Sequence, residues 1–82
     1  MEERIGSVLI IVDNKDDVTK LNEIISSFST IIVGRQGISL KEKDQSIISL
    51  VLEGSTDQLG ALTGKLGKLK GIRVKSILMK NQ

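Results

Sequence analysis

The sequence contains no cysteine and no histidine. Their absence excludes disulfides, haem and iron–sulfur ligation, ordinary zinc sites, and catalysis by a thiol or an imidazole. Phe28 is the only aromatic residue. Proteins that bind single-stranded nucleic acid stack bases on several aromatic side chains, so this mode of binding is not expected. We predict no cofactor and no metal, and carboxylates, lysines, hydroxyls and the backbone remain for chemistry.

Long apolar segments are absent as well. The sequence starts with an acidic stretch and reaches an apolar run of only Val8 to Val12, far shorter than a secretory signal or a membrane span. We therefore expect a cytoplasmic protein. Its 82 residues contain no proline and no linker, which predicts a single domain over residues 1–82. A chain this short buries only about 60% of its unfolded surface, so assembly into an oligomer would add useful burial.

Apolar periodicity divides the chain into six segments. Strands are predicted over residues 5–12, 30–33, 47–52 and 72–79, and Lys41–Asp44 reads as a polar turn between the second and third strands. Helices are predicted after the first and third strands. The order βαββαβ predicts an α+β ferredoxin-like sandwich, in which two helices cover one face of a four-stranded antiparallel sheet.

Both helices begin at recognisable capping sequences. Asn14–Asp17 precedes the first helix, which should end near Ser27 or Phe28, and either Asp16 or Asp17 is expected to cap it. Asp13, Asp16 and Asp17 could also bind a cation or an amine, although the calcium-loop pattern is not met. Ser55 and Gln58 form a capping-box pattern for the second helix, and Gly71 is placed to end that helix.

The central strands are apolar on both sides. Side chains of one parity form an apolar face that should lie under the helices: Val8, Ile10, Val12, Ile48, Leu50 and Leu52. Side chains of the other parity include Ile5, Leu9, Ile11, Ile47 and Val51, yet no third layer remains in this chain to cover them. This pattern predicts a homo-oligomer, a dimer or a tetramer, that forms through sheet faces or edges.

The stretch GALTGKLGKLKGIRVK, residues 60–75, combines glycines with lysines. It lacks the spacing of a phosphate-binding loop and of a dinucleotide fingerprint. On a helix, the leucines gather on one side and Gly60, Gly64 and Gly67 on the other. Each interior glycine costs about 0.5 to 1 kcal/mol relative to alanine. The glycines therefore indicate close contact with another backbone or with a ligand, or else a weak helix that an oligomer tolerates.

The charges are unevenly distributed. Six basic residues and no acidic one lie between Lys65 and Lys80. This run could bind anions such as nucleic acid, although a solvated helix face and an edge strand explain it equally well. Arg35, next to Gly37, could hold a carboxylate or a phosphate, or lie in an exposed turn. No carboxylate pair or marked hydroxyl is placed for catalysis, so we expect no enzymatic activity.

The sequence resembles a family of small ferredoxin-like proteins proposed to regulate the iron-only hydrogenase system. These proteins are related to ACT domains and to the C-terminal domain of the nickel-responsive repressor. The resemblance is carried by IGSVLIIVDN at 5–14, IIVGRQGI at 31–38, SIISLVLEG at 46–54 and above all LGALTGKLGKLKGIRVKS at 59–76. It implies a βαββαβ fold, assembly into dimers or higher oligomers, and a role in transcriptional or metabolic regulation.

The departures from the wider group limit what the resemblance implies. The sequence has none of the histidines and cysteine with which the nickel repressor senses nickel. The repressor reads DNA with an N-terminal domain, whereas here the first strand is expected to start near Ile5. Nickel sensing and DNA binding on its own are therefore not expected. ACT domains bind amino acids around the first strand–helix loop at subunit interfaces. The matching stretch, Asp13–Asp17, lacks the glycine often found there.

We therefore predict a stand-alone ACT-like regulatory module that oligomerises and binds a small anionic metabolite at a subunit interface. The candidate ligand-binding residues are Arg35, Gly37, Gly60, Thr63, Gly64 and Lys65. The candidate interface residues are Leu9, Ile11, Ile47, Val51, Gly60, Gly64 and Gly67. Two alternatives remain: a nucleic-acid-binding accessory protein that uses the Lys65 to Lys80 surface, and a structural adaptor for a protein partner.

Overall fold

Segments rich in aliphatic residues form the strands of a single sheet. In the computed structural model, which describes residues 3–79, these are β1 (Arg4–Val12), β2 (Ile32–Leu40), β3 (Gln45–Gly54) and β4 (Ile72–Leu78). Their order is β2-β3-β1-β4, and each neighbouring pair is antiparallel. The first and third strands are thus central, and the predicted ferredoxin-like topology is confirmed.

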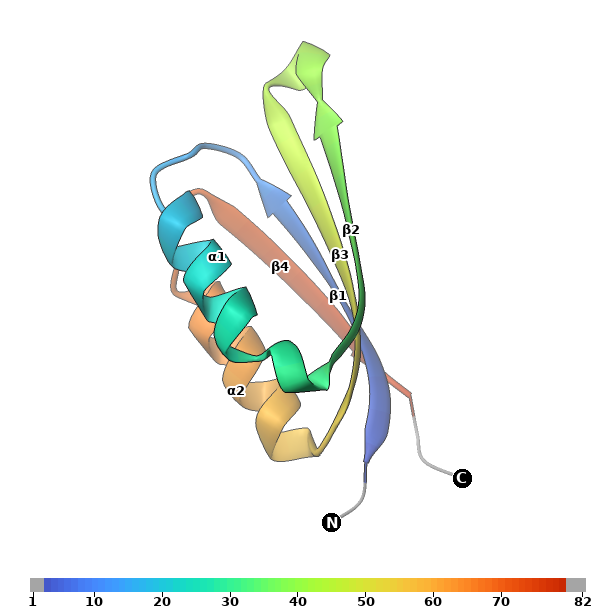
Figure 1. Cartoon of the computed structure of the whole chain (residues 1–82). Coiled ribbons are helices and arrows are strands. Elements are labelled where there is room, and N and C mark those ends of the chain that lie inside the picture. The colour runs from blue at the N-terminus through green and yellow to red at the C-terminus, as the bar shows by residue number, and fades with distance from the viewer. Residues whose placement is uncertain (1–2, 80–82) are drawn as a thin grey trace.

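Two helices lie side by side on one face of this sheet (Figure 1). They are α1 (Val18–Ser27) and α2 (Thr56–Gly67), and short 3₁₀ turns occupy Ser29–Ile31 and Lys41–Lys43. The predicted capping box starts α2: the Gln58 amide donates to Ser55 Oγ at 3.1 Å, and the Ser55 amide donates to Gln58 Oε1 at 2.9 Å. No helix among residues 3–79 is long and apolar enough to cross a membrane.

The core lies between the helices and the central strands. Leu62 and Leu66 of α2 and Leu21 of α1 are almost completely buried against the sheet. The predicted inner face of the sheet is confirmed, since five of its six residues are buried and Ile48 is partly buried against them. The opposite face of the sheet is open, and it exposes the apolar side chains of Ile5, Leu9, Ile38, Val51 and Ile77.

Strand β2 is much longer than predicted. The expected strand over residues 30–33 ends before Gly34, but the observed strand runs to Leu40, and Thr30 lies in the preceding 3₁₀ turn. Glycines 34 and 37 therefore lie inside the strand, because the backbone keeps pairing with β3 as far as the Leu40 and Gln45 pair. The resulting β2–β3 hairpin, called the arm below, projects beyond the helices (Figure 1).

The α2–β4 connection also differs from prediction. The helix ends at Gly67, and Lys68 occupies the C-cap position, so Gly71 does not terminate it. Gly71 instead adopts φ +72° in the turn that leads into β4, a left-handed conformation that favours glycine. The last strand ends at Leu78, one residue before the predicted limit.

The predicted cap of the first helix is wrong. Asp17 occupies the N-cap position of α1, but its side chain makes no capping hydrogen bond. Its backbone, at φ −110° and ψ 23°, is not in the extended conformation that usually turns a cap side chain towards the helix. The Asp17 carboxylate instead accepts a hydrogen bond of 2.7 Å from the Lys70 amide, which ties the β1–α1 loop to the α2–β4 turn.

Candidate functional site

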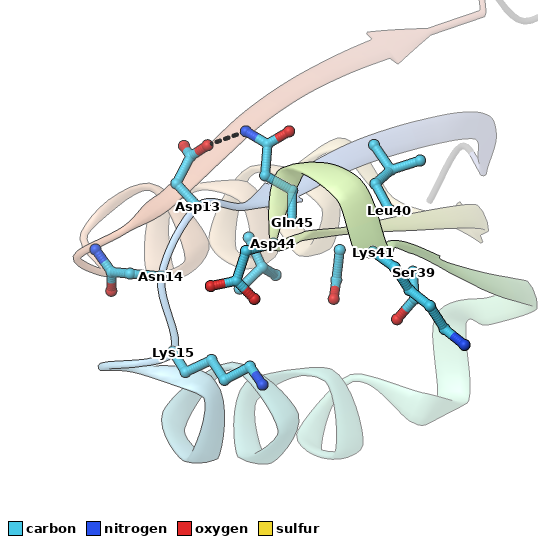
Figure 2. A pocket seen from close by; sticks show the side chains of 10 residues that line it. Asp13, Asn14, Lys15, Ser39, Leu40, Lys41, Asp44 and Gln45 are labelled. Atoms are coloured by element: carbon cyan, nitrogen blue, oxygen red, sulfur yellow. Dashed lines mark hydrogen bonds between the residues drawn. The ribbon is translucent and has the colours of Figure 1, made fainter.

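A cleft of about 500 Å³ lies between the β1–α1 loop and the end of the arm (Figure 2). This volume is within the usual range for sites that bind small molecules. The loop and the arm tip meet because β3 begins beside the end of β1, where Val12 pairs with Ser46. The cleft is lined by Val12, Asp13, Asn14, Lys15, Ser39, Leu40, Lys41, Asp44, Gln45 and Ser46.

Asp13 fixes one wall of the cleft. Its carboxylate accepts two hydrogen bonds from Arg73 of β4, at 2.6 and 2.9 Å, and one from Gln45 of β3 at 2.7 Å. The hydrogen bond from Arg73 lowers the pKa of the Asp13 carboxyl, against a smaller opposing effect of burial, and Gln45 lowers it further. Both oxygens of the Asp13 carboxylate therefore accept hydrogen bonds. Through them, the end of β1 is linked to the first residue of β3 and to the start of β4.

The loop itself is held from the other side by Gly71. The Gly71 carbonyl accepts hydrogen bonds from the amides of Asp13 and Asn14, at 2.7 and 3.4 Å. The Asn14 side chain packs so closely against Gly71 that a Cβ atom there would lie 2.2 Å from Asn14 Oδ1. The same Oδ1 accepts a hydrogen bond from the Asp16 amide at 3.1 Å. The backbone of the turn thus determines where Asn14 lies in the cleft.

The cleft continues beneath the arm into a second hollow of about 360 Å³, with which it shares Val12, Lys15 and Ser46. This inner part is more apolar and lies between Val18 of α1 and Ile48 of β3. Asn22 also lines it and accepts a hydrogen bond of 3.4 Å from Arg35 of β2. The predicted residue Arg35 therefore lies beside the far end of the hollow.

The polar groups of the combined cleft include two lysines and two serine hydroxyls beside carboxylates and amides. Lys15 reaches from the loop into the space below the arm, and Asp44 points into it from the arm (Figure 2). Lys41 adds a second ammonium group, and Ser39 and Ser46 add hydroxyls. Asp13 is neutralised by Arg73, so Asp44 is the carboxylate left to oppose these cations. Such a set can hold a small anion whose apolar part enters the inner hollow.

The predicted ligand-binding residues do not all lie together in one chain. Arg35 and Gly37 are on β2, at one edge of the sheet, and their pairing with Leu50 and Ile48 places them on its helix-covered side. The remaining predicted residues, Gly60, Thr63, Gly64 and Lys65, are on α2. Gly60 and Thr63 lie beside β4, at the opposite edge of the sheet. Arg35 donates a hydrogen bond to Asn22 of the inner hollow, and Gly37 pairs with Ile48, which also lines it.

The α2 residues have local roles or face open space. Lys65 Nζ lies 5.4 Å from the centre of the Phe28 ring, in a cation–π contact. The Thr63 hydroxyl donates to carbonyls of its own helix. A Cβ atom added at Gly60, Gly64 or Gly67 would meet nothing within 4 Å. Among residues 3–79, therefore, no close contact explains the three glycines.

The predicted interface residues of the central strands lie on the open face of the sheet. Leu9 and Val51 are exposed there, whereas Ile11 and Ile47, which pair with each other, are partly buried. This face ends at the Asp13–Arg73 ion pair.

The basic run does not form one surface. Lys65 and Lys68 belong to the helical layer, whereas Arg73 and Lys75 pair with open-face residues of β1 and lie on the other side of the sheet. Lys80 lies outside the described residues. Among residues 3–79, no group of three or more acidic residues could hold a metal ion. The arrangement thus gives neither a continuous basic face nor a cluster of metal ligands.

Sequence reasoning missed the lysines and hydroxyls of the cleft. In the sequence, Lys15 belongs to a predicted helix start, and Lys41–Asp44 to a predicted turn. Neither pattern indicates a binding site. A signal was available, because the βαββαβ order brings the first strand–helix loop beside the second strand–strand turn. The sequence did not reveal that β2 and β3 extend far enough to form a wall above α1.

Comparison with known proteins places this geometry in a family. A solved structure titled as uncharacterized protein TM1266 from Thermotoga maritima is 39% identical, with a TM-score of 0.91 over 96% of this chain and 100% of that one. The ACT domain of GTP pyrophosphokinase from Chlorobium tepidum has a TM-score of 0.76 at 22% identity, over 93% of this chain and 100% of that one. A nitrogen regulatory PII-like protein from Thiomonas intermedia has 0.54 at 10% identity, over 95% of each chain.

The last two likenesses show the fold, and no protein with curated function matches the chain. A family model described as "TM1266-like: Iron-only hydrogenase system regulator, putative" matches residues 4–76. This match covers nearly the whole domain, including all four sequence blocks on which the resemblance was based. The protein therefore belongs to the family of iron-only hydrogenase system regulators that this model describes.

Proposed function

We propose that this protein is an oligomeric regulatory module of the iron-only hydrogenase system that binds a small anionic metabolite in the cleft between the β1–α1 loop and the arm. The cleft is the observation that carries the proposal. It combines a suitable volume, two lysines with no acidic partner among residues 3–79, and an apolar inner hollow. Regulation follows if the bound metabolite changes how the module contacts its partners.

The edge of β2 supports assembly around this cleft. Pairing of β2 with β2 of a second copy, about a two-fold axis at Gln36, places Arg35 opposite Gly37 and Gly34 opposite Ile38. Arg35 and Ile38 then each face a glycine, and no like charges lie directly opposite one another. The strand has nine residues and no proline, so its free edge is suited to pairing.

This pairing completes the cleft with a residue from the second copy. Gly37 lies opposite Ile48 of β3, whose side chain lines the inner hollow. Arg35 of the partner subunit, opposite Gly37, would therefore lie beside the hollow and add a cation to Lys15. The predicted pair of Arg35 and Gly37 then acts across the subunit interface. The open face, with Leu9 and Val51, offers a second contact surface for a tetramer.

Ligand binding is tested by thermal denaturation with a panel of organic acids, amino acids and nucleotides. A ligand at ten times its dissociation constant stabilises the folded protein by about 1.4 kcal/mol, which raises the melting temperature by several degrees. Lys15→Gln should remove most of this rise. Lys20→Gln, which changes the same charge on an exposed part of α1 outside the cleft, should preserve it. Equal effects of the two variants, or no stabilising compound, would contradict the ligand-binding proposal.

Assembly is tested by light scattering at micromolar concentration. We expect a dimer or a tetramer, and Gln36→Glu should weaken the β2 pairing because it places two carboxylates directly opposite one another. Leu9→Glu should weaken contact through the open face and leave the β2 pairing intact. A monomeric native protein would refute the oligomer. An oligomer that resists Gln36→Glu but not Leu9→Glu would assign the main interface to the sheet face.

A further inference from the structure

A narrow groove runs between α2 and the free edge of β4, on the side of the molecule opposite the arm. It encloses about 90 Å³, and small side chains shape it: Gly6 on the floor, Gly60 and Thr63 on the helix, and Ser76 on the strand. Leu78, which also lines the groove, is 44% exposed. The candidate cleft and the β2 pairing proposed above use none of these residues.

The strand beside the groove has an unpaired edge. β4 is the last strand of the sheet, and it pairs with β1 alone among the described strands. Its seven residues contain no proline, so each backbone amide can donate a hydrogen bond. Val74, Ser76 and Leu78 lie on the side of α2, whereas Lys75 and Ile77 lie on the open face. An added strand would therefore present one set of side chains to the groove and another to Lys75.

The flank of α2 leaves room for such a strand. Gly60 and Thr63 line the groove, and helical spacing of about 100° per residue places Gly64 and Gly67 on the same flank. Open space surrounds the Cβ position of each glycine. Bulky side chains at these positions would narrow the approach to the β4 edge, so their absence keeps the groove accessible.

The charge and polarity of the β4 edge indicate which kind of strand could pair with it. Two basic residues, Arg73 and Lys75, lie on the open face of β4, and Arg73 is already bound by Asp13. Lys75 therefore offers its charge beside the strand edge, while the apolar residues Ile77 and Met79 are 67% and 61% exposed. A second copy is a poorer occupant of this edge, because its own β4 would bring Arg73 and Lys75 towards the same residues.

We propose that the β4 edge and the α2 groove bind an extended, acidic peptide segment of a partner protein by strand addition. The backbone of the segment pairs with β4. Its apolar side chains face Val74, Ser76 and the groove, and alternate carboxylates face Lys75 on the open side. This contact goes beyond the metabolite cleft and gives the module a surface for a protein partner.

The test uses a fluorescein-labelled nine-residue peptide of alternating glutamate and valine, with fluorescence anisotropy as the readout. We expect binding by the native protein, and about tenfold weaker binding of the matching peptide with lysine in place of glutamate. A glutamate–valine peptide with a central proline should also bind weakly, because proline removes a ladder hydrogen bond. Failure of the native protein to bind the glutamate peptide would overturn the proposal.

Protein variants then locate the contact. Lys75→Glu should weaken binding of the glutamate peptide about tenfold, and Gly60→Arg should block the groove. Lys20→Glu makes the same charge change on α1 and should leave binding unchanged. Equal losses from Lys75→Glu and Lys20→Glu would show non-specific attraction and overturn the proposal, as would peptide-induced NMR shifts at β2 instead of β4. The metabolite screen does not depend on this surface, so the two proposals can fail separately.

Discussion

Gly71→Ala is expected to lower the free energy of unfolding by about 2 to 3 kcal/mol. Gly71 has φ +72°, where an alanine side chain costs about 1 to 2 kcal/mol. The new Cβ atom would also overlap the Asn14 side chain, which packs directly against Gly71. Asn14 would have to move, and its hydrogen bond with the Asp16 amide would break. That bond contributes about 1 kcal/mol. Chemical denaturation of both proteins measures the difference.

Gly37→Ala is the matched control for this prediction. A Cβ atom at Gly37 would meet nothing within 4 Å, and its φ is not positive, so we expect little loss of stability. Gly71→Ala should in addition weaken metabolite binding, because Asn14 lines the cleft. Equal stability of the two variants would show that the turn relaxes freely, and would refute the view that Gly71 sets the position of the loop.

Gly60→Ala combined with Gly64→Ala is expected to stabilise the isolated chain by about 1 to 2 kcal/mol. Both glycines lie inside α2, where alanine is favoured by about 0.5 to 1 kcal/mol per residue. Open space at both Cβ positions means that no clash offsets this gain. For a domain of this size, the melting temperature should rise by about 4 to 16 °C. Scanning calorimetry at low protein concentration measures the effect.

The concentration dependence of this double variant separates the interpretations of the glycines. If they only make the helix weak, the gain should be the same at every protein concentration. If they form part of an oligomer interface, the gain should shrink or reverse as the concentration rises, because the added methyl groups would hinder association. A loss of stability even for the monomer would contradict the exposed position of Gly60 and Gly64 on α2.

The sequence was sufficient to predict the sheet topology and the faces of the central strands. Ile10 and Leu50 are fully buried beneath the helices, as their parity predicts, while Leu9 and Val51 are exposed on the other side. The Ser55 and Gln58 pattern predicted both hydrogen bonds of the capping box. The strand faces follow from the alternation of apolar residues along each strand, and the capping box from two residues three positions apart. Both patterns can be read directly from a single sequence.

Features that depend on distant residues could not be predicted in the same way. Asp17 does not cap α1, because its carboxylate binds the Lys70 amide, 53 residues further along the chain. Gly34 and Gly37 indicated the end of β2, but pairing with β3 keeps them in the strand. The Asp13–Arg73 ion pair likewise joins residues 60 positions apart. Local preference was overridden by long-range contacts in each of these cases.

The candidate site was predicted only in part. Arg35 lies beside the inner hollow of the cleft, but Lys65 packs over Phe28, on the neighbouring layer. The lysines that line the cleft come from two polar segments, and neither segment carries a motif. These segments come together because the arm is long. The sequence did not indicate that length, because Gly34 and Gly37 favoured an early end of β2.

The strand order also determines when the fold can be completed during synthesis. β1 emerges from the ribosome first, but it lies in the middle of the sheet and pairs with β3 and with β4. Its inner-face residues are covered only after the helices have been made, and its pairing is complete only after β4, the last strand of the sheet. Such non-local pairing slows folding and exposes apolar strands to aggregation. Of the four strands, β1 thus waits longest between its synthesis and its complete pairing.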